Sequence, residues 1–397
     1  MSDWQGRDGC TMVPGLETAD PEVIVPMPSN SERTKIALCL PGGGATSAMF
    51  QIGALAAFED SVDGFEVNGF DFYVGSSGGA SVAAALAGGL PVQRIYRAFL
   101  DPADVYFGLE RKHLLRVDLG EWRRTLVSAL SALRHGASSL LSRSSAPPPA
   151  AFFEELDRLY DSLPAGLFTL DGYERFLEDF FVRRGVSNSF YGLPRPLRIL
   201  AHDLDSGQLA IFGADGSAEV SVTRACIASM AVPPFFSPVR IGERHYINAG
   251  AGQVAHLEVA IEQGANVLVV VNPMVASSVA TVPTGHGHRD SLRDKGMMWV
   301  LNQAMRIGIH KIVREACERI LLEGRAQVIL IEPSPEDCIL FMYNPASFDA
   351  RRAILEYAYR HTRAELARSF ASGDGKLERA GLRPRPPPSS VFPPISA

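Results

Sequence analysis

Cysteine is scarce in this 397-residue sequence and forms no recognisable pattern. The five cysteines are Cys10, Cys39, Cys226, Cys317 and Cys338, and no two of them form a Cys-x-x-Cys pair. A scattered, odd-numbered set argues against a disulfide framework or a zinc ribbon and is typical of a reducing compartment. We therefore expect a cytoplasmic protein.

A strong charge of one sign and a long apolar run are also lacking. The sequence has 38 basic and 44 acidic residues, a net charge of -6 and a pI near 5.9, which argues against nucleic acid as the main partner. The longest weakly polar run, residues 80–92, contains Gly88, Gly89 and Pro91 and is shorter than the roughly 18 to 20 apolar residues of a spanning helix. Residues 1–30 carry five acids and no apolar segment, so we expect no signal peptide.

The composition is that of a globular α/β protein. Apolar residues make up 46% and charged residues 21%. Apolar runs predict strands at 35–40, 70–74, 197–201, 209–212, 267–271 and 328–331. Helical spacing predicts helices at 49–58, 80–87, 119–141, 152–160, 173–181, 255–263 and 292–322. Asp171 is expected to cap the fifth of these helices and Gly185 to end it. Alternating strands and helices predict a largely parallel sheet with helices on both faces.

The chain is expected to divide into four parts. Residues 1–34 read as a flexible lead, 35–333 as an α/β domain with a helical insertion at about 101–196, 334–382 as a helical extension, and 383–397 as a proline-rich tail.

A strand-turn-helix pattern surrounds Ser77. The turn Gly75-Ser-Ser-Gly-Gly79 fits G-x-S-x-G, in which flanking glycines permit a strained turn that projects the middle serine. The alternative is a glycine-rich turn that only packs a helix on a strand. Its place between an apolar strand and a helix favours Ser77 as a nucleophile at a helix N-terminus.

The first strand runs into Gly42, Gly43 and Gly44. Backbone N–H groups without side chains around them are suitable donors for an oxyanion hole. The same loop nearly spells a nucleotide-binding G-x-G-x-x-G, with Asp60 or Asp63 for a ribose, but Ser47 occupies the last glycine position. Nucleotide binding is therefore the weaker interpretation.

Together these segments resemble the patatin-like phospholipases. That family has a glycine-rich oxyanion loop and a G-x-S-x-G turn in this order. The matching blocks are residues 41–53, 74–80, 202–207, 228–238, 245–250 and 262–271. The resemblance implies a three-layer α/β fold, hydrolysis of glycerolipid or phospholipid esters through a serine nucleophile, and peripheral association with a membrane.

Two departures from the family pattern point to weakened catalysis. Asn248-Ala249 replaces the family's Asp-Gly, so the position of the usual Ser–Asp dyad holds a carboxamide, which is no general base. Thr46 and Ser47 replace the usual basic residue and glycine in the first loop. We expect Asn248 to lie within hydrogen-bond reach of Ser77. A non-catalytic lipid-binding or regulatory protein on the same scaffold is the alternative.

Other titratable residues are weaker candidates. Asp203, Asp205, His202, His245 and His256 lie in or near the later blocks, and we interpret Asp205 as part of a turn between two strands. His286 and His288 have no nearby ligand set, so we assign no metal and no redox cofactor.

The insertion is the expected contact with a membrane. Residues 119–141 place Trp122 and several leucines beside Arg123, Arg124 and Arg134. Such a stretch binds anionic membranes weakly if it is exposed and is ordinary core if it is packed.

Overall fold

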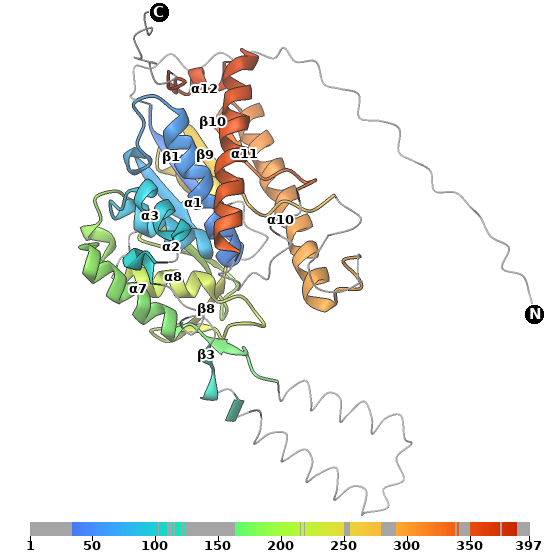
Figure 1. Ribbon diagram of the computed structural model, residues 1–397. Helices are drawn as coiled ribbons and strands as arrows, with labels where there is room; N and C mark the ends of the chain where they lie inside the picture. Colours follow the sequence, from blue (N-terminus) through green and yellow to red (C-terminus); the bar gives the residue numbers. More distant parts are fainter. Residues whose placement is uncertain are drawn as a thin grey trace, which may run out of the picture. The chain divides into compact units, whose positions relative to one another are not determined.

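The fold is built on one mixed β-sheet. In a computed structural model the chain is described at residues 34–101, 103–108, 113, 116–120, 122–123, 125, 163–214, 216–217, 219–249, 255–278, 291–337, 340, 350–373 and 375–386 (Figure 1). The strands of this sheet are β1 (Ile36–Leu40), β2 (Phe72–Gly75), β5 (Leu197–Asp203), β6 (Leu209–Phe212), β7 (Val239–Ile241), β8 (Arg244–Asn248), β9 (Val267–Val271) and β10 (Gln327–Ile331).

Its central strands are parallel. The order is β10-β9-β1-β2-β5-β8-β7, and β6 also pairs with β5. From β10 to β5 every neighbouring pair is parallel, whereas β6, β7 and β8 pair in the antiparallel sense. The six predicted strands are all present, and the largely parallel sheet is confirmed. The short antiparallel strands β7 and β8 escaped prediction because three to five half-exposed residues give little apolar periodicity.

The helices are α1 (Gly44–Ser61), α2 (Gly78–Ala87), α3 (Val92–Leu100), α7 (Asp171–Arg184), α8 (Val222–Met230), α9 (Ala255–Glu262), α10 (Met297–Leu322), α11 (Arg351–Ser372) and α12 (Lys376–Arg379). Three single turns, η1 (Val67–Gly69), η2 (Val105–Phe107) and η3 (Phe190–Gly192), and a small hairpin, β3 (Arg116–Val117) with β4 (Phe168–Thr169), complete the described elements.

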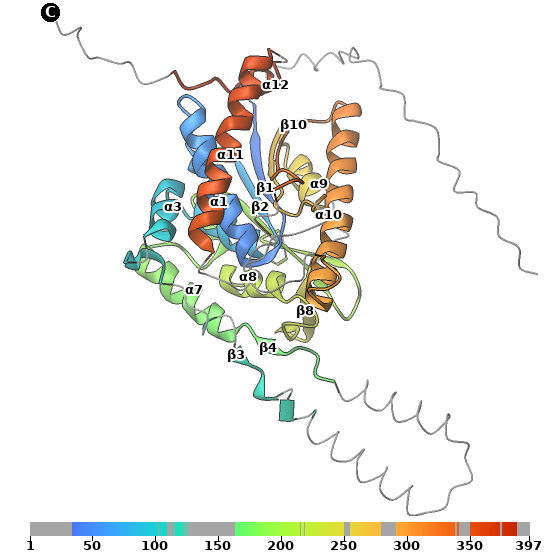
Figure 2. The same ribbon diagram turned by 45° about the vertical axis from the view of Figure 1, so that its right-hand side comes forward.

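Helices cover both faces of the sheet, as predicted (Figure 2). Successive strand residues point to opposite faces. Leu38 and Leu40 of β1 belong to the core formed with α1, α2, α3, α7, α8 and α11. Ala37 and Cys39 belong to a second core formed with α9 and α10. The four β1 side chains named above, Ala37 to Leu40, are fully buried.

Several predicted boundaries were wrong. The helix expected at 49–58 begins at Gly44, so the third glycine of the loop is already helical. Asp171 was expected to cap α7 but is its first residue, and Leu170 is the N-cap. Gly185 ends the helix as predicted, in a left-handed conformation. The helix expected from residue 292 begins at Met297, after Gly296 at φ 98°. The predicted helix at 152–160, most of the one at 119–141 and residues 286 and 288 lie outside the described residues.

Candidate active site

Ser77 lies in a strained turn between β2 and α2. Its φ of 53° and ψ of -129° make it the one non-glycine residue of the described chain with positive φ. A Cβ on Gly79 would lie 2.2 Å from the carbonyl oxygen of Leu40, and one on Gly75 would lie 2.7 Å from that of Gly79. Only glycines therefore permit the close contacts that hold Ser77 in a conformation costing about 1–3 kcal/mol. Strain of this kind is typical of a nucleophile at a strand-to-helix turn.

The hydroxyl of Ser77 forms no hydrogen bond that supports the fold within the described chain. Although Ser77 is the N-cap residue of α2, its side chain makes no capping hydrogen bond. Within the described chain the hydroxyl bonds to no other group, and the residue is only 4% exposed. A serine hydroxyl at a helix N-terminus that neither caps the helix nor bonds elsewhere is available to a substrate, so the arrangement favours a reactive function.

The glycine loop lies directly against Ser77. A Cβ on Gly42 would stand 2.5 Å from the Cβ of Ser77, so no side chain fits there. Gly43 has φ 147°, and Gly44 begins α1. The backbone amides of Gly42 and Gly43 donate to no acceptor among the described residues. Unbonded donors beside a nucleophile are what an oxyanion hole requires.

Asn248 is joined to Ser77 through Ser229. The backbone amide of Ser77 donates to the hydroxyl of Ser229 at 2.7 Å, and the side-chain amide of Asn248 donates to the Ser229 carbonyl. Register explains the proximity, because β5 pairs Ile199 with Gly75 on one side and Ala201 with Asn248 on the other. The expected direct hydrogen bond between Ser77 and Asn248 is absent from the described residues, because the Asn248 side chain donates to the end of α8 instead.

The two substituted positions of the first loop are buried. Ser47 donates from its hydroxyl to the Gly43 carbonyl at 2.8 Å, which fastens the loop to the first turn of α1. The Thr46 hydroxyl is buried with no partner among the described residues. Where the family carries a charge, this chain has a small uncharged side chain.

A second support of the loop comes from α10. The thioether of Met274 would lie 2.6 Å from a Cβ on Gly43. The Arg306 guanidinium donates to the carbonyls of Pro273 at 2.9 Å and Val275 at 3.2 Å, on either side of Met274. Arg306 is 2% exposed, and desolvation lowers its pKa to about 10. It therefore stays charged at neutral pH and fixes the segment that packs on the glycine loop.

Sequence reasoning missed Ser229, Met274 and Arg306. Ser229 lay inside a block matched to the family but had no signal of its own. Met274 reaches Gly43 across more than 200 residues of chain, and Arg306 acts through the carbonyls on either side of Met274, so neither had a local pattern.

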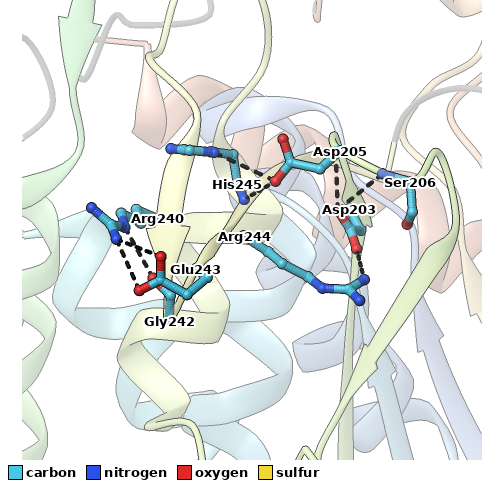
Figure 3. A network of polar contacts seen from close by, with 8 residues as sticks. All are labelled: Asp203, Asp205, Ser206, Arg240, Gly242, Glu243, Arg244 and His245. Atoms are coloured by element: carbon cyan, nitrogen blue, oxygen red, sulfur yellow. Dashed lines mark hydrogen bonds and ion pairs between the residues drawn. The ribbon is translucent and has the colours of Figure 1, made fainter.

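Three of the alternative bases, Asp203, Asp205 and His245, belong to a polar network of their own at β5 and β8 (Figure 3). Asp203 accepts hydrogen bonds from Arg244 and from the backbone amides of Asp205 and Ser206. The Arg244 bond, more than any other contact, lowers the pKa of Asp203 below its usual value. A carboxylate held ionised in this way is a weak proton acceptor.

Asp205 belongs to the same turn, as predicted. Its carboxylate accepts from the His245 amide at 2.8 Å and lies 3.5 Å from the His245 ring. Both side chains are about half exposed, so this pair is a surface contact. His202 lies in β5, and the side chain of His256 lies outside the described part.

An apolar cavity adjoins the loop and the turn. Gly44 of α1 and Gly78 of α2 lie at one part of its wall, and Ile52, Phe99, Phe107 and Phe180 at another. The Tyr173 hydroxyl and the Ser81 hydroxyl are 3.0 Å apart in this wall. The cavity has a volume of about 70 Å³, well below the 300–1,000 Å³ typical of ligand pockets, so a long chain enters only if side chains move.

The glycine loop, the turn and the later strands all lie within the region matched by one family model. The model of the patatin-like phospholipases covers residues 38–261, more than half of the chain. The chain belongs to the patatin-like phospholipase family. A patatin-like α/β sandwich is therefore the fold, as the resemblance implied.

Solved structures give more distant similarities. VipD from Legionella pneumophila is 15% identical at a TM-score of 0.35, with 85% of this chain and 67% of that chain covered. ExoU from Pseudomonas aeruginosa, in complex with SpcU, is 18% identical at a TM-score of 0.32, with 84% of this chain and 52% of that chain covered. A human group IVD cytosolic phospholipase A2 is 11% identical at a TM-score of 0.30, with 88% of this chain and 59% of that chain covered. The chain thus spans about half to two thirds of these longer proteins. A search of curated proteins found no significant match.

The described helices and the start of the 119–141 stretch bear on contact with a membrane. Among the described helices, none is long and apolar enough to span a bilayer. At the start of the 119–141 stretch, Leu119 is 77% exposed and Trp122 is 37% exposed, with the Trp122 ring nitrogen 3.3 Å from the Leu167 carbonyl.

Proposed function

We propose that this patatin-like protein is a lipid acyl hydrolase that cleaves carboxylic esters of glycerolipids through an acyl-Ser77 intermediate. The observation that carries the proposal is the contact of Gly42 with Ser77, which sets unbonded amide donors beside a strained serine with an unbonded hydroxyl. The Ser77 oxygen would attack the ester carbonyl carbon, and the amides of Gly42 and Gly43 would stabilise the resulting oxyanion. Its collapse would break the ester C–O bond and release the lipid alcohol, which carries away the proton lost by Ser77. Water would then hydrolyse the acyl-Ser77 ester to the free fatty acid and restore the serine.

The acyl chain would enter the adjoining apolar cavity. That cavity begins at Gly44 and Gly78, next to the oxyanion donors and the nucleophile, and is lined by aliphatic and aromatic side chains. An acyl group bound there would have its carbonyl at the loop, which is the orientation that transfer to Ser77 needs.

Proton transfer is the weak step of this proposal. Asn248 takes the place of the family's aspartate and its side chain donates to Ser229, so it neither accepts the Ser77 proton nor orients the hydroxyl directly. We expect slow turnover. Loss of one member of a catalytic unit leaves roughly 10³–10⁴-fold acceleration over water in a serine protease, because oxyanion donors and binding remain.

A non-catalytic lipid-binding role is the second candidate, and Asn248 is the observation that favours it. The two are separated by measuring hydrolysis of a short-chain ester and a phospholipid by the natural chain, Asn248→Asp, and the double variant Asn248→Asp with Ser77→Ala. A gain of tenfold or more in Asn248→Asp, abolished by adding Ser77→Ala, supports the hydrolase. Inactivity of all three chains supports the binding role.

A fluorophosphonate probe tests the nucleophile independently of turnover. We expect covalent labelling of the natural chain and of Ser76→Ala, the matched change in the same turn, and none in Ser77→Ala. Labelling that persists in Ser77→Ala removes Ser77 from the proposal.

A further inference from the structure

A basic groove lies on the outer side of α7. It has a volume of about 1,040 Å³ and is bordered by η2, α7 and the residues leading into β3. Its lining includes His113, Arg116, Arg175, Arg183 and Arg184, and Asp179 is the one acidic residue found there among the described residues. Four arginines therefore line one groove, although the net charge of the protein is -6.

The charge of this groove is not neutralised locally. Across the described part of the chain, Arg116, Arg175, Arg183 and Arg184 form no ion pair with a carboxylate. Arg183 donates to the Asp179 backbone carbonyl at 3.1 Å, and Arg184 to that of Tyr106 at 2.9 Å. These bonds orient the guanidinium groups and leave their charge available for an anion.

One wall of the groove is pre-organised. The Arg184 guanidinium lies 3.9 Å from the centre of the Tyr106 ring, and that of Arg94 lies 4.1 Å from it. Arg94 is itself paired with Asp104 through two bonds of 2.7 and 2.9 Å. The stacked Arg184 is thus held in place without an acid of its own, which lowers the entropy lost when it binds a ligand.

Two exposed aliphatic side chains lie beside the arginines of the groove. Val105 of η2 lines the groove and is 88% exposed, and Val182, next to Arg183 in α7, is 79% exposed. Exposed aliphatic side chains beside arginines are typical of a surface that meets a membrane interface.

The groove also shares a wall with the apolar cavity. Phe180 of α7 lines both of them, and neighbouring residues of η2, Tyr106 and Phe107, line one each. A ligand seated in the groove would therefore hold a lipid surface against the helix that forms the outer wall of the cavity beside Ser77.

We propose that this groove binds the phosphomonoester headgroup of an anionic lipid and docks the protein on a membrane. Guanidinium groups bind phosphate oxygens in pairs, and a phosphomonoester carries a charge of about -1.5 to -2 at neutral pH. The site is distinct from the stretch at 119–141 and from the residues proposed to act in hydrolysis.

Vesicle binding by the Ser77→Ala chain tests the site without hydrolysis, so failure here leaves the proposed hydrolase untouched. Vesicles of phosphatidylcholine alone are compared with vesicles that also contain phosphatidic acid or phosphatidylserine at equal surface charge. We expect the tightest binding to phosphatidic acid. Equal binding to both anionic lipids would mean a diffuse field rather than a headgroup site and would overturn the proposal.

Charge reversal locates the site. Arg175→Glu with Arg183→Glu should weaken binding at least about 30-fold. Loss of two basic residues, each contributing about 1 kcal/mol or roughly fivefold near an anionic membrane, gives this factor, and the two added carboxylates are repelled as well. The matched control, Arg360→Glu with Arg363→Glu on α11, makes the same change in net charge outside the groove and should bind as before. Equal losses in the two double variants contradict the proposal.

Two further comparisons separate a headgroup site from a general effect of charge and from binding of a soluble phosphate. Arg175→Lys with Arg183→Lys retains the charge and should still lose affinity, and circular dichroism must show folded protein in every variant. Glycerol 3-phosphate supplies the same phosphate free in solution. Calorimetric binding of this soluble phosphate as tight as that of the vesicles would assign the groove to a soluble phosphate and overturn the membrane role.

Discussion

The backbone amide of Ser77 donates a hydrogen bond to the hydroxyl of Ser229, 152 residues away in the chain, over 2.7 Å. The same hydroxyl donates to the carbonyl of Leu200 in β5 at 2.5 Å. Both serines are buried, with Ser229 fully inaccessible. Ser229 therefore ties the strained turn to the neighbouring strand, and its bond to the Ser77 amide keeps that amide out of the proposed set of oxyanion donors.

Ser229→Ala should reduce ester hydrolysis and fluorophosphonate labelling at least tenfold. The change leaves two buried backbone groups without a partner, which costs about 1–3 kcal/mol for each group in the free energy of unfolding. Chemical denaturation and labelling rates measure the two effects. Ser206→Ala, on the surface turn after β5, is the matched control and should leave labelling unchanged. Labelling as fast in Ser229→Ala as in the natural chain would contradict a positioning role.

The sequence predicted the parts of the site that depend on local conformation. Gly75, Ser77 and Gly79 are adjacent, and only glycine tolerates the contacts of such a turn, so the motif alone was enough to predict it. Gly42–Gly44 followed from the same logic, although Gly44 proved to be helical. The partners of these residues depend instead on tertiary contacts, and nothing in the residues near Ser229 or Arg306 indicates which carbonyl each will reach.

Gly42→Ala should abolish measurable hydrolysis while the protein stays folded. Its new methyl group would stand 2.5 Å from the Ser77 Cβ, so the loop or the nucleophile must move. A displacement of about 1 Å at a reacting centre can cost a factor of 10². Activity and thermal unfolding are measured together. Gly308→Ala, in α10 with no atom near the added methyl group, should keep full activity and gain up to about 1 kcal/mol of helix stability.

Short acyl chains should be preferred over long ones. The cavity beside Ser77 is small, and Phe99 and Phe107 form part of its wall in ring contact, with centroids 4.8 Å apart. Phe99→Ala should enlarge the cavity and shift the preference towards longer esters, measured as kcat/KM for butyrate, octanoate and palmitate esters. Phe190→Ala, a buried aromatic outside the cavity lining, controls for general loss of packing. An unchanged chain-length profile in Phe99→Ala means that acyl chains bind elsewhere.

The Asp203–Arg244 pair should contribute stability that disappears in acid. Its hydrogen bond lowers the pKa of Asp203 in the folded protein, whereas the unfolded carboxyl titrates near 3.9. A lowered folded-state pKa stabilises the protein above the unfolded value and ceases to do so as pH falls through the folded value. The difference in free energy of unfolding between the natural chain and Asp203→Asn should therefore be constant above about pH 5 and shrink below about pH 4. Urea unfolding at several pH values measures it, and a difference independent of pH down to pH 2 would refute the pairing.

Arg306 should act on the rate of hydrolysis through the segment that packs on Gly43. Arg306→Met removes the donors to the Pro273 and Val275 carbonyls, both held in a buried site, and should lower the free energy of unfolding by about 2–5 kcal/mol. Because Met274 contacts the glycine loop and does not line the apolar cavity, kcat should fall while KM for a short ester changes little. Arg306→Lys keeps the charge and one donor group, so it should recover part of kcat. Lys311→Met, an exposed position on the same helix, is the matched control and should leave both constants unchanged. A rise in KM with kcat unaffected would place the effect of Arg306 on substrate binding and contradict its role in positioning the oxyanion loop.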